Sequence, residues 1–201
     1  EPKTVSETIS KKKTPFWQAL KEMPLEYMNF LKVSLIFSLS YFSFALFIVR
    51  AAELKIAEDA IIILYLIYNI TYTLASIPAG MLSDKIGRKP VIAGAFALYA
   101  LVCVGFALAG DYLQLAGLFI LYGIFVASDE SVNKAYIADL SGAERRGTAL
   151  GAYNTAIGVA YLPASVIAGV VWAMFGAPAA FALAAAVAFL GAIGMMTMCR
   201  P

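Results

Sequence analysis

Long runs of apolar residues, separated by short polar breaks, make up most of the chain. Six of the runs are long enough to be membrane-spanning helices, since about 20 mostly apolar residues carry an α-helix across the hydrocarbon core. Charged residues, Gly and Pro punctuate the breaks between them. The predicted spans are about 28–50, 59–82, 90–109, 112–138, 147–172 and 177–198.

The two ends of the chain differ from its apolar body. Residues 1–27 are rich in polar and charged residues, and we interpret them as a cytoplasmic linker that ends in a short amphipathic helix. Such a helix suits the headgroup region of a bilayer, although the same residues also fit a frayed lead-in to the first span. Residues 199–201 follow the last run directly, and the chain begins with Glu1. We therefore expect a piece of a longer protein.

Composition agrees with a membrane protein. Hydrophobic residues make up 62% of the 201 residues and charged residues only 14%, against about 45–50% and 25% in soluble domains. The net charge of +2 gives no support for a nucleic-acid partner. The sequence shows no nucleophile–base pair, phosphate-binding loop or metal cluster, so we expect neither an enzyme nor a cofactor or metal. An all-α integral membrane protein is predicted, with the lipid bilayer as its surroundings.

The positive charges predict the orientation in the membrane. With six spans both termini lie on one side, and that side collects twelve of the 15 Lys and Arg residues. The opposite side has Arg50 and Lys55, and Lys134 lies inside a span. Because positively charged loops stay in the cytoplasm, both termini are expected there. The expected location is the cell's inner or plasma membrane.

Polar residues recur at helical spacing in the first, second, fourth and fifth spans. Each set shares one helix face, and polar groups in hydrocarbon need partners or water. Four such faces indicate a shared, wetted cavity, although hydrogen bonds between helices would also explain single polar residues. The third and sixth spans are almost wholly apolar, and a peripheral place is expected for them. The candidate cavity residues outside the fourth span are Tyr41, Tyr68, Asn69, Tyr72 and Asn154.

Charged residues inside the fourth span are the strongest functional signal. Asp129 lies ten residues before Asp139, about 15 Å along a helix and so near the middle of the membrane. An ionised residue there costs about 2.5–3.5 kcal/mol on insertion scales. Glu130 and Lys134 are spaced to form an ion pair on the helix. We predict that Asp129, Glu130 and Asn133 contact a substrate, proton or ion, with a structural hydrogen-bonding role for Asp129 as the alternative.

The break after the second span contains a dense motif, Gly80-Met-Leu-Ser-Asp-Lys-Ile-Gly-Arg-Lys-Pro90. The chain here resembles the major facilitator superfamily of secondary transporters, whose loop signature is Gly-x-x-x-Asp-Arg/Lys-x-Gly-Arg/Lys-Arg/Lys. The positions that match are Gly80, Asp84, Lys85, Gly87, Arg88 and Lys89. After the fourth span, Asp139 precedes Arg146 by seven residues, similar to the family's acidic residue followed by Arg. The resemblance implies a cytoplasmic gating network of Asp84, Arg88, Asp139 and Arg146.

The resemblance covers half of the family's fold. Members have twelve spans in two halves, and the basic leader before the first span is similar to the linker that joins them. The chain is therefore expected to be the carboxy-terminal six-helix half, partnered by an amino-terminal half or by a second copy. The expected function is secondary active transport of a small solute by alternating access, coupled to a proton or ion by symport or antiport. The alternative is a scaffold, sensor or assembly module that keeps the fold without transport.

Overall fold

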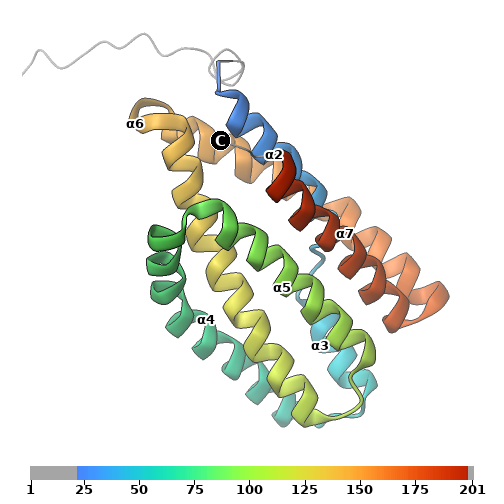
Figure 1. Ribbon diagram of the computed structural model, residues 1–201. Helices are drawn as coiled ribbons and strands as arrows, with labels where there is room; N and C mark the ends of the chain where they lie inside the picture. The colour runs from blue at the N-terminus through green and yellow to red at the C-terminus, as the bar shows by residue number, and fades with distance from the viewer. Residues whose placement is uncertain (1–21, 199–201) are drawn as a thin grey trace, which may run out of the picture.

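The computed structural model describes residues 22–198, and most of the predicted linker and amphipathic helix lies outside them. This part of the chain folds into helices without any strand (Figure 1). The helices are α2 (Leu25–Ser38), α3 (Ala45–Glu53), α4 (Glu58–Ile86), α5 (Arg88–Leu108), α6 (Tyr112–Phe175) and α7 (Ala177–Met198). Helices α4, α5, α6 and α7 are long and apolar enough to cross a membrane.

Short sequence signals account for the helix boundaries. The first turn of α4 contains Glu58 and Asp59, whose negative charges suit the positive end of a helix dipole. Asp111 caps α6, because its carboxylate accepts a hydrogen bond from the Gln114 amide at 2.9 Å. Helices α4 and α5 are separated by Gly87 at φ 94°, a conformation that favours glycine.

The predicted fourth and fifth spans both lie in α6, which consists of two helices that meet at a sharp turn at Gly142. At 64 residues, a straight helix would be about 96 Å long, far more than a membrane is thick. Gly142 interrupts the helical geometry with φ 70° and ψ 166°. In Figure 1 the part of α6 before the turn (yellow) runs beside α4 and α5, and the part after it (orange) runs beside α2 and α7. The turn therefore gives α6 the two arms that the sequence predicts as separate spans.

The predicted first span, 28–50, is not one continuous helix. It is divided into α2 and α3 by non-helical residues 39–44, and neither piece has the 18 residues of a membrane-spanning candidate. Side chains satisfy the backbone groups that the break frees. The Tyr99 hydroxyl donates to the Ser40 carbonyl at 3.0 Å, and the Ser43 amide donates to the Ser165 hydroxyl at 3.3 Å. Such partners make a broken helix tolerable at membrane depth. That residues 28–50 cross the membrane as one span stays a prediction.

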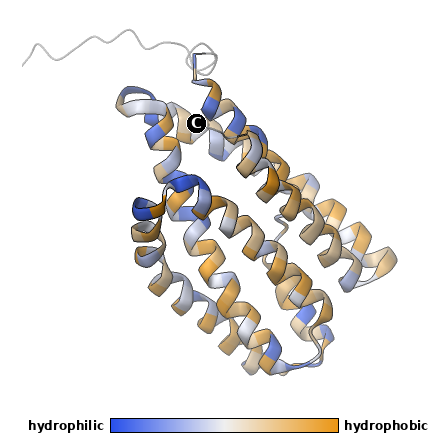
Figure 2. Cartoon of the chain, viewed as in Figure 1, coloured by the Kyte–Doolittle hydropathy of each residue, from blue (hydrophilic) through white to orange (hydrophobic). Residues whose placement is uncertain are grey.

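A network of aromatic rings forms the core. The Phe37 ring stacks on Phe96 with centroids 3.7 Å apart, which joins α2 to α5. In α3, the Phe47 ring contacts Phe106 of α5 and Phe181 of α7 at 4.8 and 5.3 Å between centroids. Hydrophobic residues run along all the helices (Figure 2), and many large apolar side chains are exposed. This surface suits lipid or another protein segment as its surroundings.

Burial within the described residues differs between the apolar helices and the helix with a polar stripe. The two helices with the fewest polar residues, α5 and α7, pack against each other and are the most buried of the membrane-length helices. By contrast α4, which carries a polar stripe, is the most exposed of the four. The small residues of α7, six of whose nine buried positions are Ala, allow the close approach that buries the pair. Within this part of the chain the two apolar helices are therefore the buried pair, and their peripheral place in the whole protein stays a prediction.

Candidate functional site

A polar pocket of about 330 Å³ lies between the two arms of α6. One wall comes from the arm before Gly142 and the other from the arm after it. The pocket is lined by Asp129, Glu130, Asn133, Lys134, Tyr153, Asn154, Ile157, Gly158 and Tyr161. The fold thus brings together four of the predicted site residues, Asp129, Glu130, Asn133 and Asn154. The turn at Gly142 positions both walls, because it folds the helix back on itself.

A chain of hydrogen bonds joins the two walls. The Asn133 Nδ2 group donates to Asp129 Oδ1 at 2.7 Å and to the Tyr153 hydroxyl at 3.2 Å. Asn133 is only 4% exposed, and its carbonyl Oδ1 has no hydrogen-bond partner among the described residues. Phe30 stacks on the Tyr153 ring at 5.6 Å between centroids. The Asp129 carboxylate is therefore bonded to the Asn133 amide group. The unpaired Asn133 carbonyl beside it can still accept a hydrogen bond.

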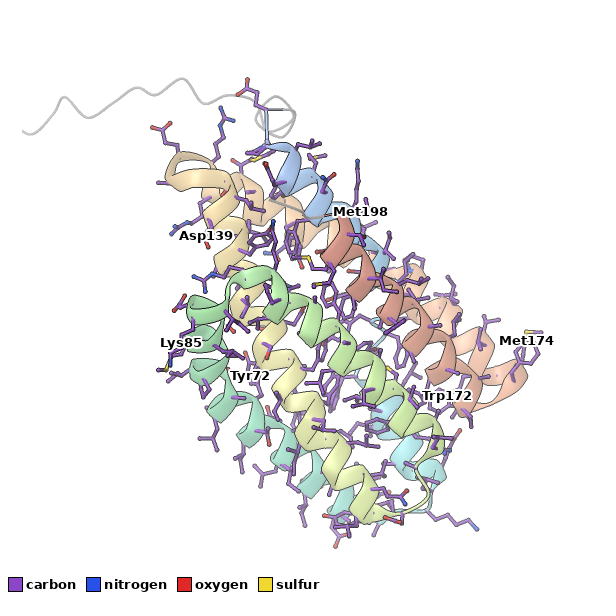
Figure 3. The ribbon with its side chains drawn as sticks, in the orientation of Figure 1. Tyr72, Lys85, Asp139, Trp172, Met174 and Met198 are labelled. Carbon is purple, nitrogen blue, oxygen red and sulfur yellow. The ribbon has the colours of Figure 1, made fainter. Side chains whose placement is uncertain are left out.

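Glu130 and Lys134 form the predicted ion pair. The Lys134 Nζ lies 3.3 Å from Glu130 Oε2, and the Tyr72 hydroxyl of α4 donates to the same oxygen at 3.2 Å. This contact attaches α4 to the pocket's edge (Tyr72 is labelled in Figure 3). Both charged side chains are about half exposed or more. Their charges neutralise each other, so Asp129 is the acidic group of the lining that has no cationic partner among the described residues. No group of three His, Cys, Asp or Glu among residues 22–198 is arranged to hold a metal.

The other predicted cavity residues lie beside the pocket or away from it. Tyr41 contacts a pocket residue, because its ring centroid is 5.2 Å from that of Tyr161. Its hydroxyl is 3.1 Å from that of Tyr122. The Tyr68 ring packs near Tyr122 at 5.3 Å. Asn69 is not brought to the pocket, because its amide donates to the backbone of its own helix. The polar stripe of α4 therefore contributes one hydrogen bond to this site, through Tyr72.

Sequence reasoning missed Tyr153 as a pocket residue. Tyr153, Ile157 and Tyr161 are spaced four residues apart, so they share one face of α6 and all line the pocket. In this arm the cavity residue predicted from the sequence was Asn154 alone, which lies next to Tyr153. The i, i+4, i+8 spacing was the available signal for this wall.

A second polar cluster lies at the ends of α4 and α5, where Lys85 and Asp139 are labelled in Figure 3. Arg88 is its centre. Its guanidinium lies 2.8 Å from Asp84 Oδ1 and 3.2 Å from Asp139 Oδ2, and it donates to the Ser83 hydroxyl at 2.5 Å. The cluster connects the α4–α5 turn to α6. It includes three of the four residues in the implied gating network.

The fourth implied member, Arg146, makes no ion pair with residues 22–198. Its neighbour Arg145 does, with Nη2 3.0 Å from Glu22 Oε2 and Nη1 donating to the Glu22 carbonyl at 2.8 Å. Lys85 and Lys89 likewise make no ion pair within the described residues. The motif therefore supplies one bridging cation, Arg88, and Arg145 attaches the segment before α2 to the turn in α6.

A separate cluster connects α3 to the far ends of α5 and α6. Arg50, whose side chain is 13% exposed, donates to the carbonyls of Phe106 and Ala109 at 3.2 and 3.1 Å. Its partner Glu53 accepts a hydrogen bond from Trp172 Nε1 at 2.8 Å. Trp172 is labelled in Figure 3 at the opposite end of the bundle from Asp139. A cation at the carbonyl end of α5 also suits the helix dipole.

Comparisons with known proteins agree with these features. The family model of the Major Facilitator Superfamily matches residues 28–201. An uncharacterized MFS-type transporter, MJ1317 of Methanocaldococcus jannaschii, is 45% identical over 81% of this chain and 42% of its own length. The inner membrane transport protein YajR of Escherichia coli is 30% identical over 62% of the chain and 27% of its own length.

The multi-drug resistance efflux pump PmrA of Streptococcus pneumoniae is 32% identical over 60% of the chain and 29% of its own length. The chain thus spans less than half the length of these relatives. Their names support membrane transport of a solute, which agrees with a polar pocket among membrane-length helices. The chain is a member of the Major Facilitator Superfamily.

Proposed function

We propose that the chain is the carboxy-terminal half of a secondary transporter that moves a small solute by alternating access. The observation that carries this proposal is the pocket at Asp129. A carboxylate in the middle of a membrane-length helix is costly, and here it lines a pocket instead of being sealed in an ion pair. Such a group is suited to exchange a proton or a cation with solvent during transport.

The Arg88 cluster suits the closing of one side of the transporter. Its carboxylates are exposed by about 60%, and ion pairs of this kind contribute about 0–1 kcal/mol each. A contact that must form and break in every cycle needs to be weak. By this proposal the cluster lies on the cytoplasmic face and holds the α4–α5 turn against α6 until the two halves rock.

The amino-terminal half, on this proposal, covers the exposed side of α4 and closes the pocket. Large apolar side chains project from α4 along its length, including Leu74 and Ile77 at 71% and 74% exposure. The relatives are more than twice as long as the matched segment. A second copy of the chain would serve the same geometric purpose.

Proton flux through proteoliposomes tests the proposal. The full-length protein is reconstituted with a trapped pH-sensitive dye, and organic cations, organic anions and sugars are added in turn. At least one solute should drive proton movement, and Asp129→Asn should reduce that flux at least tenfold. Asp59→Asn is the matched control, because it makes the same chemical change at the start of α4, and it should retain the flux within twofold.

Two results would contradict the proposal. Flux of unchanged rate and pH dependence in Asp129→Asn would remove the coupling role. A well-folded protein that moves no solute, but retains a protein partner from detergent extracts, would favour the scaffold alternative.

A further inference from the structure

The pocket at Asp129 also indicates which class of solute it binds. We infer that its ligand is a small organic cation with N–H donors, a primary ammonium or a guanidinium, next to an aromatic or apolar group. This inference rests on the proposed function, because it treats the pocket as the solute site. It follows from the charge of the lining, from its unused hydrogen-bonding capacity and from the rings of its walls.

The lining contains one acidic group more than its cations balance. Glu130 and Lys134 lie 3.3 Å apart and neutralise each other. Within the described residues no cation pairs with Asp129, whose hydrogen-bond donor is the neutral amide of Asn133. An organic anion would therefore meet an uncompensated carboxylate, whereas a monovalent cation would neutralise it.

The hydrogen-bonding groups around Asn133 that have no partner favour a ligand that donates hydrogen bonds. The Asn133 amide N–H groups are used by Asp129 and Tyr153. What remains is the second oxygen of Asp129, which has no donor among the described residues, and the buried carbonyl of Asn133, which has no partner there. Both groups are acceptors. A ligand with several N–H donors satisfies them, whereas a quaternary ammonium has no N–H to donate.

The walls explain the aromatic or apolar part of the ligand. Tyr153 and Tyr161 both line the pocket, and each ring is held by another, Tyr153 by Phe30 and Tyr161 by Tyr41. Fixed rings provide faces for stacking and for cation–π contact. Ile157, between them on the same helix face, adds apolar surface. The volume of about 330 Å³ is at the small end of ligand pockets.

A binding assay separates this inference from the transport proposal, because it needs no flux. The thermal midpoint of the detergent-solubilised full-length protein is measured against 2-phenylethylammonium, its N,N,N-trimethyl analogue and 3-phenylpropionate, since a ligand of the native state raises the midpoint. The primary ammonium should reach its half-maximal shift at a concentration at least tenfold below that of the trimethyl analogue. Phenylpropionate should give no shift.

Substitutions of Asp129 test whether its carboxylate causes the preference for the primary ammonium. Asp129→Asn should abolish the difference between the primary and the trimethyl ammonium. Asp129→Glu, which keeps the charge, should restore part of it, and the Asp59→Asn control should match the unmodified protein. A purely structural role for Asp129 would lower every midpoint equally and leave the preference for the primary ammonium unchanged, which would overturn the inference.

The remaining outcomes distinguish the two proposals. Equal or tighter binding of the trimethyl analogue or of phenylpropionate, or proton flux driven only by anions or sugars, would overturn the ligand class and leave transport intact. An Asp129-dependent preference for the primary ammonium in a protein that moves no solute would support the ligand class and contradict transport.

Discussion

The contact between α4 and the first arm of α6 depends on Gly123, and replacing it with Ala gives a sharp test of the packing. A Cβ at this position would lie 2.9 Å from the Thr71 Cβ, 2.9 Å from the Tyr68 carbonyl oxygen and 3.1 Å from the Tyr72 amide nitrogen. Two of these three atoms belong to the α4 backbone, so rotation of a side chain cannot relieve the contact. The helices must separate.

The size of the effect follows from these distances. Relief to an ordinary contact of 3.4 Å requires a displacement of about 0.5 Å between the helices. Overpacking of this kind costs about 1–3 kcal/mol, whereas Gly→Ala in an unconstrained helix gains up to about 1 kcal/mol. We therefore expect Gly123→Ala to lower the free energy of unfolding by about 1–2 kcal/mol. The displacement also weakens the bond from Tyr72 to Glu130 at the pocket's edge, which is already 3.2 Å long.

Reversible denaturation in mixed detergent micelles measures this difference. Gly117→Ala is the matched control, because Gly117 lies in the same helix arm and a Cβ there meets nothing within 4 Å. The control should be neutral or slightly stabilising. If Gly123→Ala proved as stable as Gly117→Ala, the close approach of α4 and α6 at this point would be refuted.

Three further predictions concern single polar contacts. Tyr27→Phe removes the hydrogen bond from a buried hydroxyl to the Ala149 carbonyl at 2.8 Å and should cost about 1 kcal/mol in the same unfolding assay; no change would mean that the bond contributes nothing. Arg50→Met leaves two carbonyls at the end of α5 without their donor and should cost about 1–3 kcal/mol, and a loss below 0.5 kcal/mol would argue against the connection. Asp139→Asn removes one exposed partner of Arg88 and should change the free energy of unfolding by less than about 1 kcal/mol. The same substitution should raise the labelling rate of a cysteine placed at Ser83 at least threefold. Unchanged labelling would contradict the role of Asp139 in closing that face.

The broken first span shows where local sequence reasoning stops. Residues 28–50 have the apolar content of one helix, and no Pro or Gly lies among them to mark a break. The interruption at 39–44 is satisfied by Tyr99 of α5 and Ser165 of α6. Both partners lie far away in the sequence. A helix can give up its own hydrogen bonds only where the fold supplies others, so the break was not visible in the local pattern.

The pocket residues also divide into those that the sequence predicted and those that it missed. Periodicity and charge identified Asp129, Glu130, Asn133 and Asn154 as candidates, because charged and amide groups inside an apolar run are expensive and stand out. The spacing of Glu130 and Lys134 also indicated their pairing, since partners four residues apart meet on any helix. Tyr153 was missed, because its importance comes from its contact with Asn133 on the opposite arm of α6.

Local properties were enough to predict an all-helical membrane protein of the Major Facilitator Superfamily, because hydrophobic run length, charge asymmetry and the Gly80–Pro90 motif can each be read from neighbouring residues. The folded chain was needed to show that Arg88 pairs with Asp139 while Arg146 lies outside the cluster, that α5 and α7 are the buried pair, and that Asn69 bonds to its own helix. These outcomes depend on which helix faces meet. Helix faces meet through packing between residues that are distant in the chain. The hydropathy of successive residues does not specify that packing.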